Sequence, residues 1–182
     1  YPQQKMYYTF DIWIEKKGGV AFTKKVLRKI RMPGSKSLYN FAKVITKTFG
    51  FYFDHCFGYY DNFKHYYDSK KSYELFADIG EGSSSPLTKG VKKTQICQVF
   101  RKPGEKILFL FDYGDGWRFG IELKEINIGG EPKTAYEFST EKDAKVFGIY
   151  NAKMKVSANV NAETGEVIST NKPWWAFLAT EK

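Results

Sequence analysis

Residues that build disulfides and soft-metal sites are scarce in this chain of 182 residues, which contains two Cys and two His. Cys56 and Cys97 lie far apart, and neither belongs to a Cys-x-x-Cys pair or stands in a spaced set of Cys and His. This spacing argues against a disulfide framework and against a zinc site. We expect both thiols to be reduced and buried.

Long apolar runs are also missing. The longest, such as residues 107–111, have the length of a strand, and the N-terminal residues show no charged-then-apolar targeting pattern. A membrane-spanning helix needs about 20 consecutive apolar residues. We therefore expect a cytoplasmic protein without a membrane partner.

Signatures of catalysis are absent as well. The sequence has no Gly-x-Ser-x-Gly elbow, no phosphate-binding Gly-Lys-Ser loop, no His-Glu-x-x-His pair and no dinucleotide fingerprint after a strand. Nucleophilic, phosphate, zinc and dinucleotide chemistry need such spacings. A non-enzymatic protein is the favoured interpretation, and the sequence indicates no cofactor and no small-molecule ligand.

Aromatic residues, in contrast, are abundant at 18%, within a hydrophobic share of 42%. A chain of this length can bury about 70% of its extended surface. Because Phe and Tyr favour strands, the composition predicts a folded chain rich in β-structure.

Positive charge is concentrated in one part of the chain. Residues 1–130 carry 22 Lys and Arg against 13 Asp and Glu, which accounts for the net charge of +9, whereas residues 131–182 carry seven of each. We expect a core domain at residues 1–130 and a C-terminal extension at 131–182 that packs on it. Any anionic partner should bind the first part.

Apolar periodicity predicts the elements of the first part. Residues 7–15 and 21–32 alternate and should pair as a hairpin across Gly18-Gly19, and an amphipathic helix is expected at 37–49, closed by Gly50. Further segments follow this order: a strand within 51–63, an exposed excursion at 65–87, a short helix at 91–100, a doubly covered strand at 106–113 and its partner at 117–124.

The C-terminal part has weaker patterns. Residues 139–147 fit a short helix, and residues 158–168 fit a hairpin that turns at 163–165. Together these patterns predict an α+β fold with a mixed or antiparallel sheet, an N-terminal hairpin, one amphipathic helix packed on the sheet, a central aromatic hairpin and a less regular C-terminal appendage.

The aromatic hairpin is centred on Asp112-Tyr113-Gly114-Asp115-Gly116-Trp117. This segment resembles the family named for the third open reading frame of the Ri plasmid pRiA. Upstream, residues 27–34 resemble the arginine-bearing strand and turn of that family, residues 37–51 its helix, and residues 98–106 the run into its hairpin. The resemblance covers about residues 5–128 and implies a compact α+β domain; nothing is carried over to residues 131–182.

The resemblance implies no activity, because the family is largely uncharacterised. Its members occur in plasmids, mobile elements and ordinary prokaryotic chromosomes and have been labelled transposon passengers or resolvase-like proteins. A serine resolvase requires an activated serine and a helix-turn-helix. Neither is visible in this sequence.

Two interpretations of the hairpin compete. Asp54, His55, Asp112 and Asp115 could hold a divalent cation, as in a metal-dependent hydrolase or nuclease that uses the three Asp residues. Alternatively the hairpin residues are structural, because Asp before Gly is ordinary turn chemistry and Trp117 can anchor the turn; this set comprises Asp112, Gly114, Asp115, Gly116 and Trp117. The structural interpretation is favoured.

A basic surface is the strongest functional hint. The outward face of the second strand and nearby segments predict phosphate contacts of a nucleic acid through Lys25, Lys29, Arg31, Lys16, Lys17, Lys92 and Lys93. The alternative is a solvated edge strand, whose lysines prevent aggregation. A third hypothesis is a homo-oligomeric structural protein that associates through Trp174 and Trp175.

Overall fold

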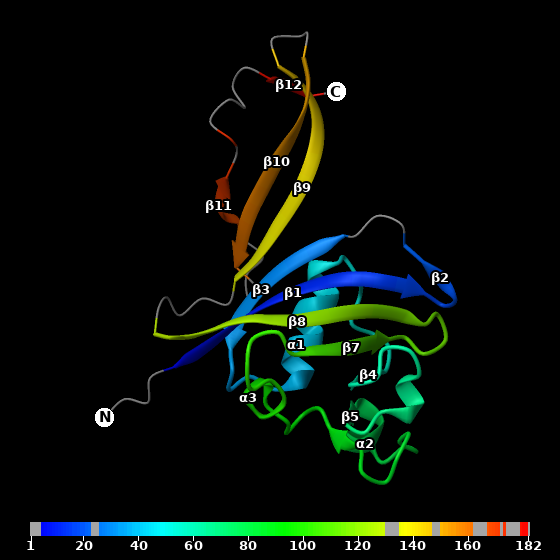
Figure 1. Cartoon of the computed structure of the whole chain (residues 1–182). Helices are drawn as coiled ribbons and strands as arrows, with labels where there is room; N and C mark the ends of the chain where they lie inside the picture. The colour runs from blue at the N-terminus through cyan, green and yellow to red at the C-terminus, as the bar shows by residue number, and fades with distance from the viewer. Residues whose placement is uncertain are drawn as a thin grey trace. The chain divides into compact units, whose positions relative to one another are not determined.

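The computed structural model describes residues 5–22, 26–129, 135–146, 150–161, 167–171, 173 and 179–181. The chain divides into two compact units, Tyr1–Pro132 and Lys133–Lys182. Strands dominate both units and helices are few, so the α+β class is confirmed (Figure 1). Among the described residues, none of the helices combines the length and apolar character that crossing a membrane requires.

The first unit is built on a sheet with the order β3-β1-β8-β7-β4-β5-β6, in which β2 also pairs with β1. Among the described strands of this unit, β5 and β6 are the one pair that runs parallel, so the sheet is mixed as predicted. The strands are β1 (Met6–Lys17), β2 (Val20–Ala21), β3 (Leu27–Pro33), β4 (Phe57–Tyr60), β5 (Ser72–Glu74), β6 (Lys89–Gly90), β7 (Lys106–Phe111) and β8 (Trp117–Ile128).

The predicted N-terminal hairpin is present as the pair of β1 and β3, with Phe10 opposite Ile30. It differs in one respect: the strand expected at 21–32 is divided into β2 and β3, and residues 23–25 between them lie outside the described residues. β1 also pairs with β8 along its whole length, so it is a central strand of the sheet, and most of its residues are buried or half-buried.

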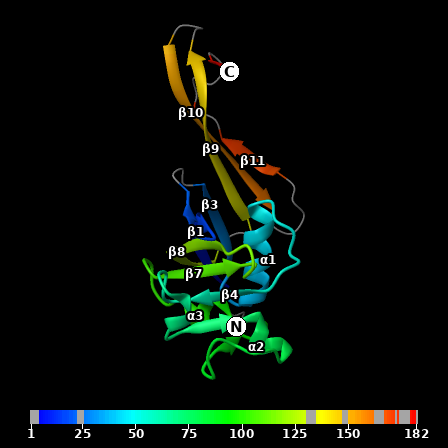
Figure 2. The same ribbon diagram turned by 90° about the vertical axis from the view of Figure 1, so that its right-hand side faces the viewer.

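The amphipathic helix is confirmed as α1 (Leu38–Thr48), which packs on one face of this sheet (Figure 2). The Ser37 hydroxyl caps it by accepting a hydrogen bond from the Asn40 amide at 3.2 Å. The buried ring of Phe41 lies 4.7 Å from that of Phe10 in β1. The apolar stripe of the helix therefore closes the main core.

The doubly covered strand is confirmed as β7, which lies between β8 and β4. Phe109 faces the helix side, where its ring lies 5.6 Å from that of Phe119. On the opposite face Leu108 and Leu110 form a second cluster with Tyr60, and it is covered by Phe63, Tyr66 and Tyr113. β7 is thus apolar on both sides because two separate layers cover it.

The exposed excursion expected at 65–87 is wrong for part of its length. This segment contains the 3-10 turn η1 (Tyr66–Asp68), the buried strand β5 and the helix α2 (Leu75–Ile79). Polar residues enter the sheet here because partners satisfy them: Glu74 accepts a hydrogen bond from the Tyr60 hydroxyl at 2.8 Å. The short helix expected at 91–100 is confirmed but covers only α3 (Ile96–Val99).

The second unit contains β9 (Ala135–Val146), β10 (Tyr150–Asn161), β11 (Val167–Asn171) and β12 (Ala179–Glu181). β10 pairs antiparallel with β9 and β11, and β12 pairs with β9. The expected helix at 139–147 and the less regular appendage are therefore wrong. Pairing with β10 over twelve residues overrides the weak local pattern of β9.

The predicted hairpin at 158–168 is confirmed by the pairing of β10 with β11, in which Val160 lies opposite Val167. Its turn at 163–165 lies outside the described residues. The packing of residues 131–182 on the core stays a prediction.

Candidate functional site

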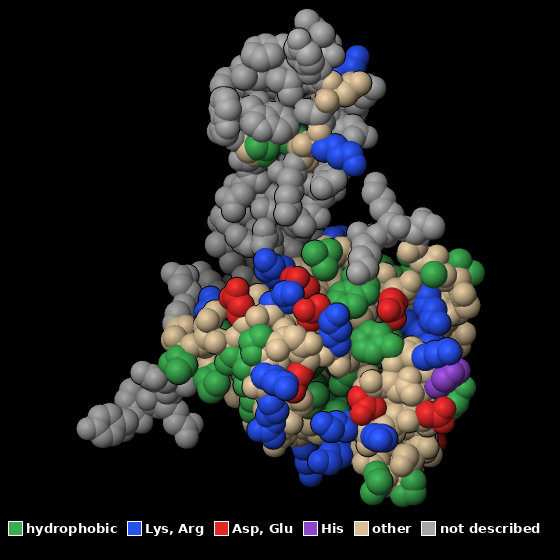
Figure 3. All heavy atoms as spheres, in the orientation of Figure 1, with side chains coloured by type: hydrophobic (Ala, Val, Ile, Leu, Met, Phe, Trp, Pro, Cys, Tyr) green, Lys and Arg blue, Asp and Glu red, His purple; other side chains and the backbone are tan. Residues whose placement is uncertain are grey.

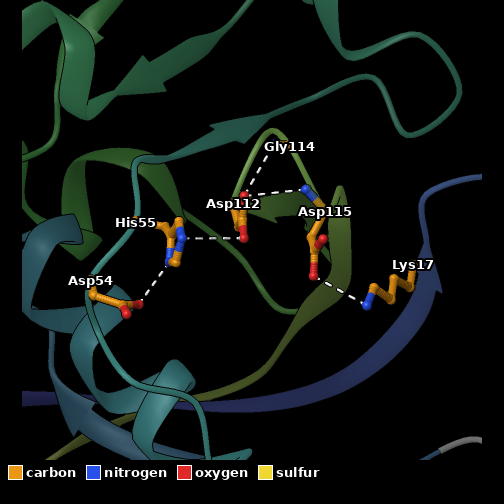
Figure 4. Close-up of polar contacts among 6 residues, drawn as sticks. All are labelled: Lys17, Asp54, His55, Asp112, Gly114 and Asp115. Carbon is orange, nitrogen blue, oxygen red and sulfur yellow. Dashed lines mark hydrogen bonds and ion pairs between the residues drawn. The ribbon is translucent and has the colours of Figure 1, made fainter.

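The β7–β8 turn is organised by Asp112, the one described non-glycine residue with a positive φ, at 56°. Its carboxylate accepts hydrogen bonds from the amides of Gly114 at 3.0 Å and Asp115 at 3.2 Å (Figure 4). Its carbonyl accepts a hydrogen bond from the amide of Gly116, which also has a positive φ. These contacts are the turn chemistry that the structural interpretation expects.

Trp117 follows this turn directly, and its ring lies in an aromatic cluster. Its ring meets that of Phe51 edge-on at 4.8 Å and stacks on that of Phe22 at 6.1 Å. The Lys17 ammonium lies 4.9 Å from the centre of the indole ring. Trp117 therefore anchors the hairpin end against the segment after α1.

The four candidate metal ligands come together only in part (Figure 4). His55 contacts Asp54 through Nδ1 at 2.7 Å and Asp112 through Nε2 at 3.5 Å, whereas Asp115 pairs with the Lys17 ammonium at 3.1 Å. Among the residues that the structure describes, no three His, Cys, Asp or Glu side chains form a group that could hold a metal ion. A metal-dependent hydrolase on these residues stays a prediction.

The pKa shifts of two groups beside the β7–β8 turn favour their charged, ion-paired forms. The hydrogen bond with Asp54, supported by the charge of Asp112, raises the pKa of His55. The hydrogen bond and charge of Lys17 lower the pKa of Asp115. Three carboxylates thus balance Lys17 and His55, so this end is not a basic surface.

The residues predicted to bind nucleic acid are spread over several surfaces. Lys29 on β3 lies opposite Asp11, and the Arg31 guanidinium lies 4.8 Å from the centre of the Tyr7 ring. Lys16 and Lys17 end β1 beside the hairpin, and Lys25 lies outside the described residues. Figure 3 shows Lys and Arg interspersed with Asp and Glu on the face of the molecule that it draws.

Lys92 and Lys93 lie elsewhere, on the turn that docks against the start of α1. The amides of Leu38 and Tyr39 donate to the carbonyls of Thr94 at 2.8 Å and Val91 at 3.1 Å. The Asp78 carboxylate fixes the same turn by accepting hydrogen bonds from the amides of Val91 at 2.6 Å and Lys92 at 2.9 Å.

This docking brings the two lysines next to those of α1. The Lys43 ammonium lies 5.8 Å and the Lys92 ammonium 5.9 Å from the centre of the Tyr39 ring. Lys43 also lies 5.9 Å from the centre of the Phe53 ring, and α1 contains no acidic residue. We call Lys43, Lys47, Lys92, Lys93 and Tyr39 the α1 basic surface; its four lysines are exposed.

Sequence reasoning missed Lys43, Lys47 and Tyr39. The available signal was a helix with lysines four residues apart and no acidic residue in between. Their proximity to Lys92 depends on how the 91–94 turn docks, and that information is absent from local periodicity.

The fold places this protein in the class of α+β domains, with a mixed sheet and one large helix. Exposed lysines gather on that helix. The family model of plasmid pRiA4b ORF-3-like proteins matches residues 20–146, and the chain belongs to this family. The match begins later than the resemblance over 5–128 and extends into β9, beyond the region to which that resemblance applied.

A crystal structure of a protein of unknown function from Methanosarcina mazei Go1 is similar in fold. The TM-score is 0.54 at 18% sequence identity, over 71% of this chain and 65% of that chain. The chain thus spans less than two thirds of the length of that protein. A search of curated proteins finds no match.

Proposed function

We propose that this chain is a non-enzymatic domain that binds nucleic acid through the α1 basic surface. The observation that carries the proposal is the convergence of two ammonium groups, Lys43 and Lys92, on the ring of Tyr39. Both lie within the distance at which a ring face attracts a cation. The ring therefore holds two like charges on one surface.

The lysines of the α1 basic surface favour an anionic ligand because their positive charges are not neutralised by nearby carboxylates in the described part of the chain. None of the four lysines forms an ion pair with a described carboxylate, whereas Lys17, Lys106 and Lys124 do. Like charges gathered on one surface repel each other, and a row of phosphates relieves that repulsion while it releases counterions. The excess of positive charge over residues 1–130 adds long-range attraction.

The test is a titration of labelled oligonucleotides at several salt concentrations with wild type and two double variants. Lys43→Gln/Lys92→Gln removes two charges from the α1 basic surface, and Lys70→Gln/Lys71→Gln removes two from the exposed loop before β5. Loss of a phosphate contact reduces the slope of log K against log salt by about 1 per lysine. We expect the first variant to lose about 2 from this slope and the second to keep it.

Three results would count against the proposal: no binding at about 50 mM salt, binding without a salt slope, or equal losses in both variants. Lys29→Gln/Arg31→Gln tests the predicted face of β3 in the same assay. Because Asp11 lies opposite Lys29, we expect this variant to behave like the control.

The homo-oligomer hypothesis stays a prediction. Trp174 and Trp175, on which it rests, lie outside the described residues.

A further inference from the structure

The loop that follows α1 supplies aromatic rings beside the α1 basic surface. The Phe53 ring meets that of Tyr39 edge-on at 5.3 Å and lies 5.3 Å from that of Phe57 in β4. The preceding Phe51 contacts Phe111 at 5.8 Å. Both phenylalanines are therefore anchored in the fold.

Tyr52 lies between these two anchors and points outward. Its side chain is 86% exposed, the most exposed large apolar side chain in the described part of the chain. No ring contact of Tyr52 with another described residue is present, whereas Phe51 and Phe53 each have several. The anchored neighbours restrain its backbone, so ordering this ring on a ligand costs side-chain entropy but little backbone entropy.

We infer that the α1 basic surface takes single-stranded nucleic acid, with an unpaired base stacked on Tyr52 and the adjoining phosphates on Lys43 and its neighbours. The inference rests on the proposed function and adds the class of ligand. Aromatic rings beside a basic surface are the arrangement by which proteins hold unpaired strands, since every base has a stacking face. In a duplex the bases stack on one another, so Tyr52 gains nothing there.

The experiment compares three labelled ligands of equal length: oligo-dT, oligo-U and a mixed-sequence duplex, each titrated by fluorescence anisotropy at two salt concentrations. The variants are Tyr52→Ser and, as a matched control, Tyr67→Ser, which removes another tyrosine with 61% exposure. Tyr52→Phe keeps the stacking face. Circular dichroism and thermal unfolding verify that each variant is folded.

We expect wild type to bind the single strands more tightly than the duplex. Tyr52→Ser should lose about tenfold in affinity for single strands and nothing for the duplex, whereas Tyr52→Phe and Tyr67→Ser keep wild-type affinity. Because stacking releases no counterions, Tyr52→Ser should leave the salt slope unchanged, which separates it from Lys43→Gln/Lys92→Gln.

Three other outcomes overturn the inference, and they distinguish its failure from that of the proposed function. Salt-dependent binding that favours the duplex, or that is equally insensitive to Tyr52→Ser and Tyr67→Ser, refutes the single-strand inference and leaves the proposed function standing. Absence of binding to all three ligands refutes both.

Discussion

At the scale of single residues, His55 is held between carboxylates from two parts of the chain. The hydrogen bond with Asp54 and then the charge of Asp112 raise its pKa above the ordinary value of 6.5. We predict that an NMR titration of the His55 ring gives a pKa above 6.5 and that Asp54→Asn lowers it. Asp61→Asn, which changes an exposed carboxylate of another loop, should leave it unchanged.

The same shift links His55 to stability. A group whose pKa is higher in the folded state stabilises that state fully below its unfolded pKa of 6.5 and loses this effect as pH rises through the folded pKa. The ring is half exposed, so solvent screens the effect and it is small. Thermal unfolding of His55→Gln should therefore approach that of wild type toward higher pH; a gap that widens with pH would contradict this.

Glu74 is a second residue for which the structure predicts the effect of a substitution. It is 1% exposed, and its carboxylate accepts hydrogen bonds from the Tyr60 hydroxyl at 2.8 Å and the Ser84 amide at 3.0 Å. Because the Tyr60 proton points at Glu74, the hydroxyl of Tyr113, 2.6 Å away, donates to Tyr60. Burial is the main cause that raises the pKa of both tyrosines, so the two hydroxyl groups stay protonated.

We predict that Glu74→Ala lowers the free energy of unfolding by about 2–4 kcal/mol, because it leaves the Tyr60 hydroxyl and the Ser84 amide without their partner. Tyr113→Phe should cost about 1 kcal/mol, since it removes a single hydrogen bond. Urea denaturation measures both. The exposed Glu81→Ala is the control, and a loss as large there would show that the network is not the cause.

At the scale of elements, β8 holds the first unit together because it pairs with both β1 and β7. The close contact between β1 and β8 depends on Gly120, over which the Trp13 ring lies so closely that an added Cβ would overlap its indole atoms. No smaller residue exists, so this position requires glycine.

We predict that Gly120→Ala destabilises the protein by about 1–3 kcal/mol, because the buried indole must move. Gly82→Ala is the matched control, since a Cβ there meets nothing within 4 Å and its φ lies outside the positive range that L residues rarely adopt. Urea unfolding of both variants measures the difference. An unfolding midpoint for Gly120→Ala equal to that of the control would show that the indole relocates freely.

The elements also show how far sequence reasoning reaches. β1, α1 and β7 were predicted because an apolar stripe of the right period is a property of the element itself. β5 was missed because Glu74 is buried through partners on β4 and in the 80–86 loop. The short apolar pattern of β9 fits the period of a helix as well as that of a strand, and its partner β10 decides between them.

At the scale of the whole molecule, the charge asymmetry predicts that an anionic partner binds residues 1–130, and the α1 basic surface that we propose as its site lies within that part. On the two N-terminal strands, Lys17 pairs with Asp115, and Lys29 lies opposite Asp11 in the β1–β3 register. Those of α1 and the 91–94 turn do not pair with described carboxylates. Net charge therefore indicates a class of partner, and only the arrangement of charges indicates where it binds.

Local period, turn residues and short motifs are enough to predict the α+β class, the family, the amphipathic helix and the doubly covered β7 from the amino-acid sequence. Tertiary structure decided which charged side chains are neighbours. Lys43 and Lys92 meet at Tyr39 only because the 91–94 turn docks on α1, and His55 meets Asp112 only because β4 pairs with β7. Strand order and docking bring distant segments together, and no local pattern encodes them.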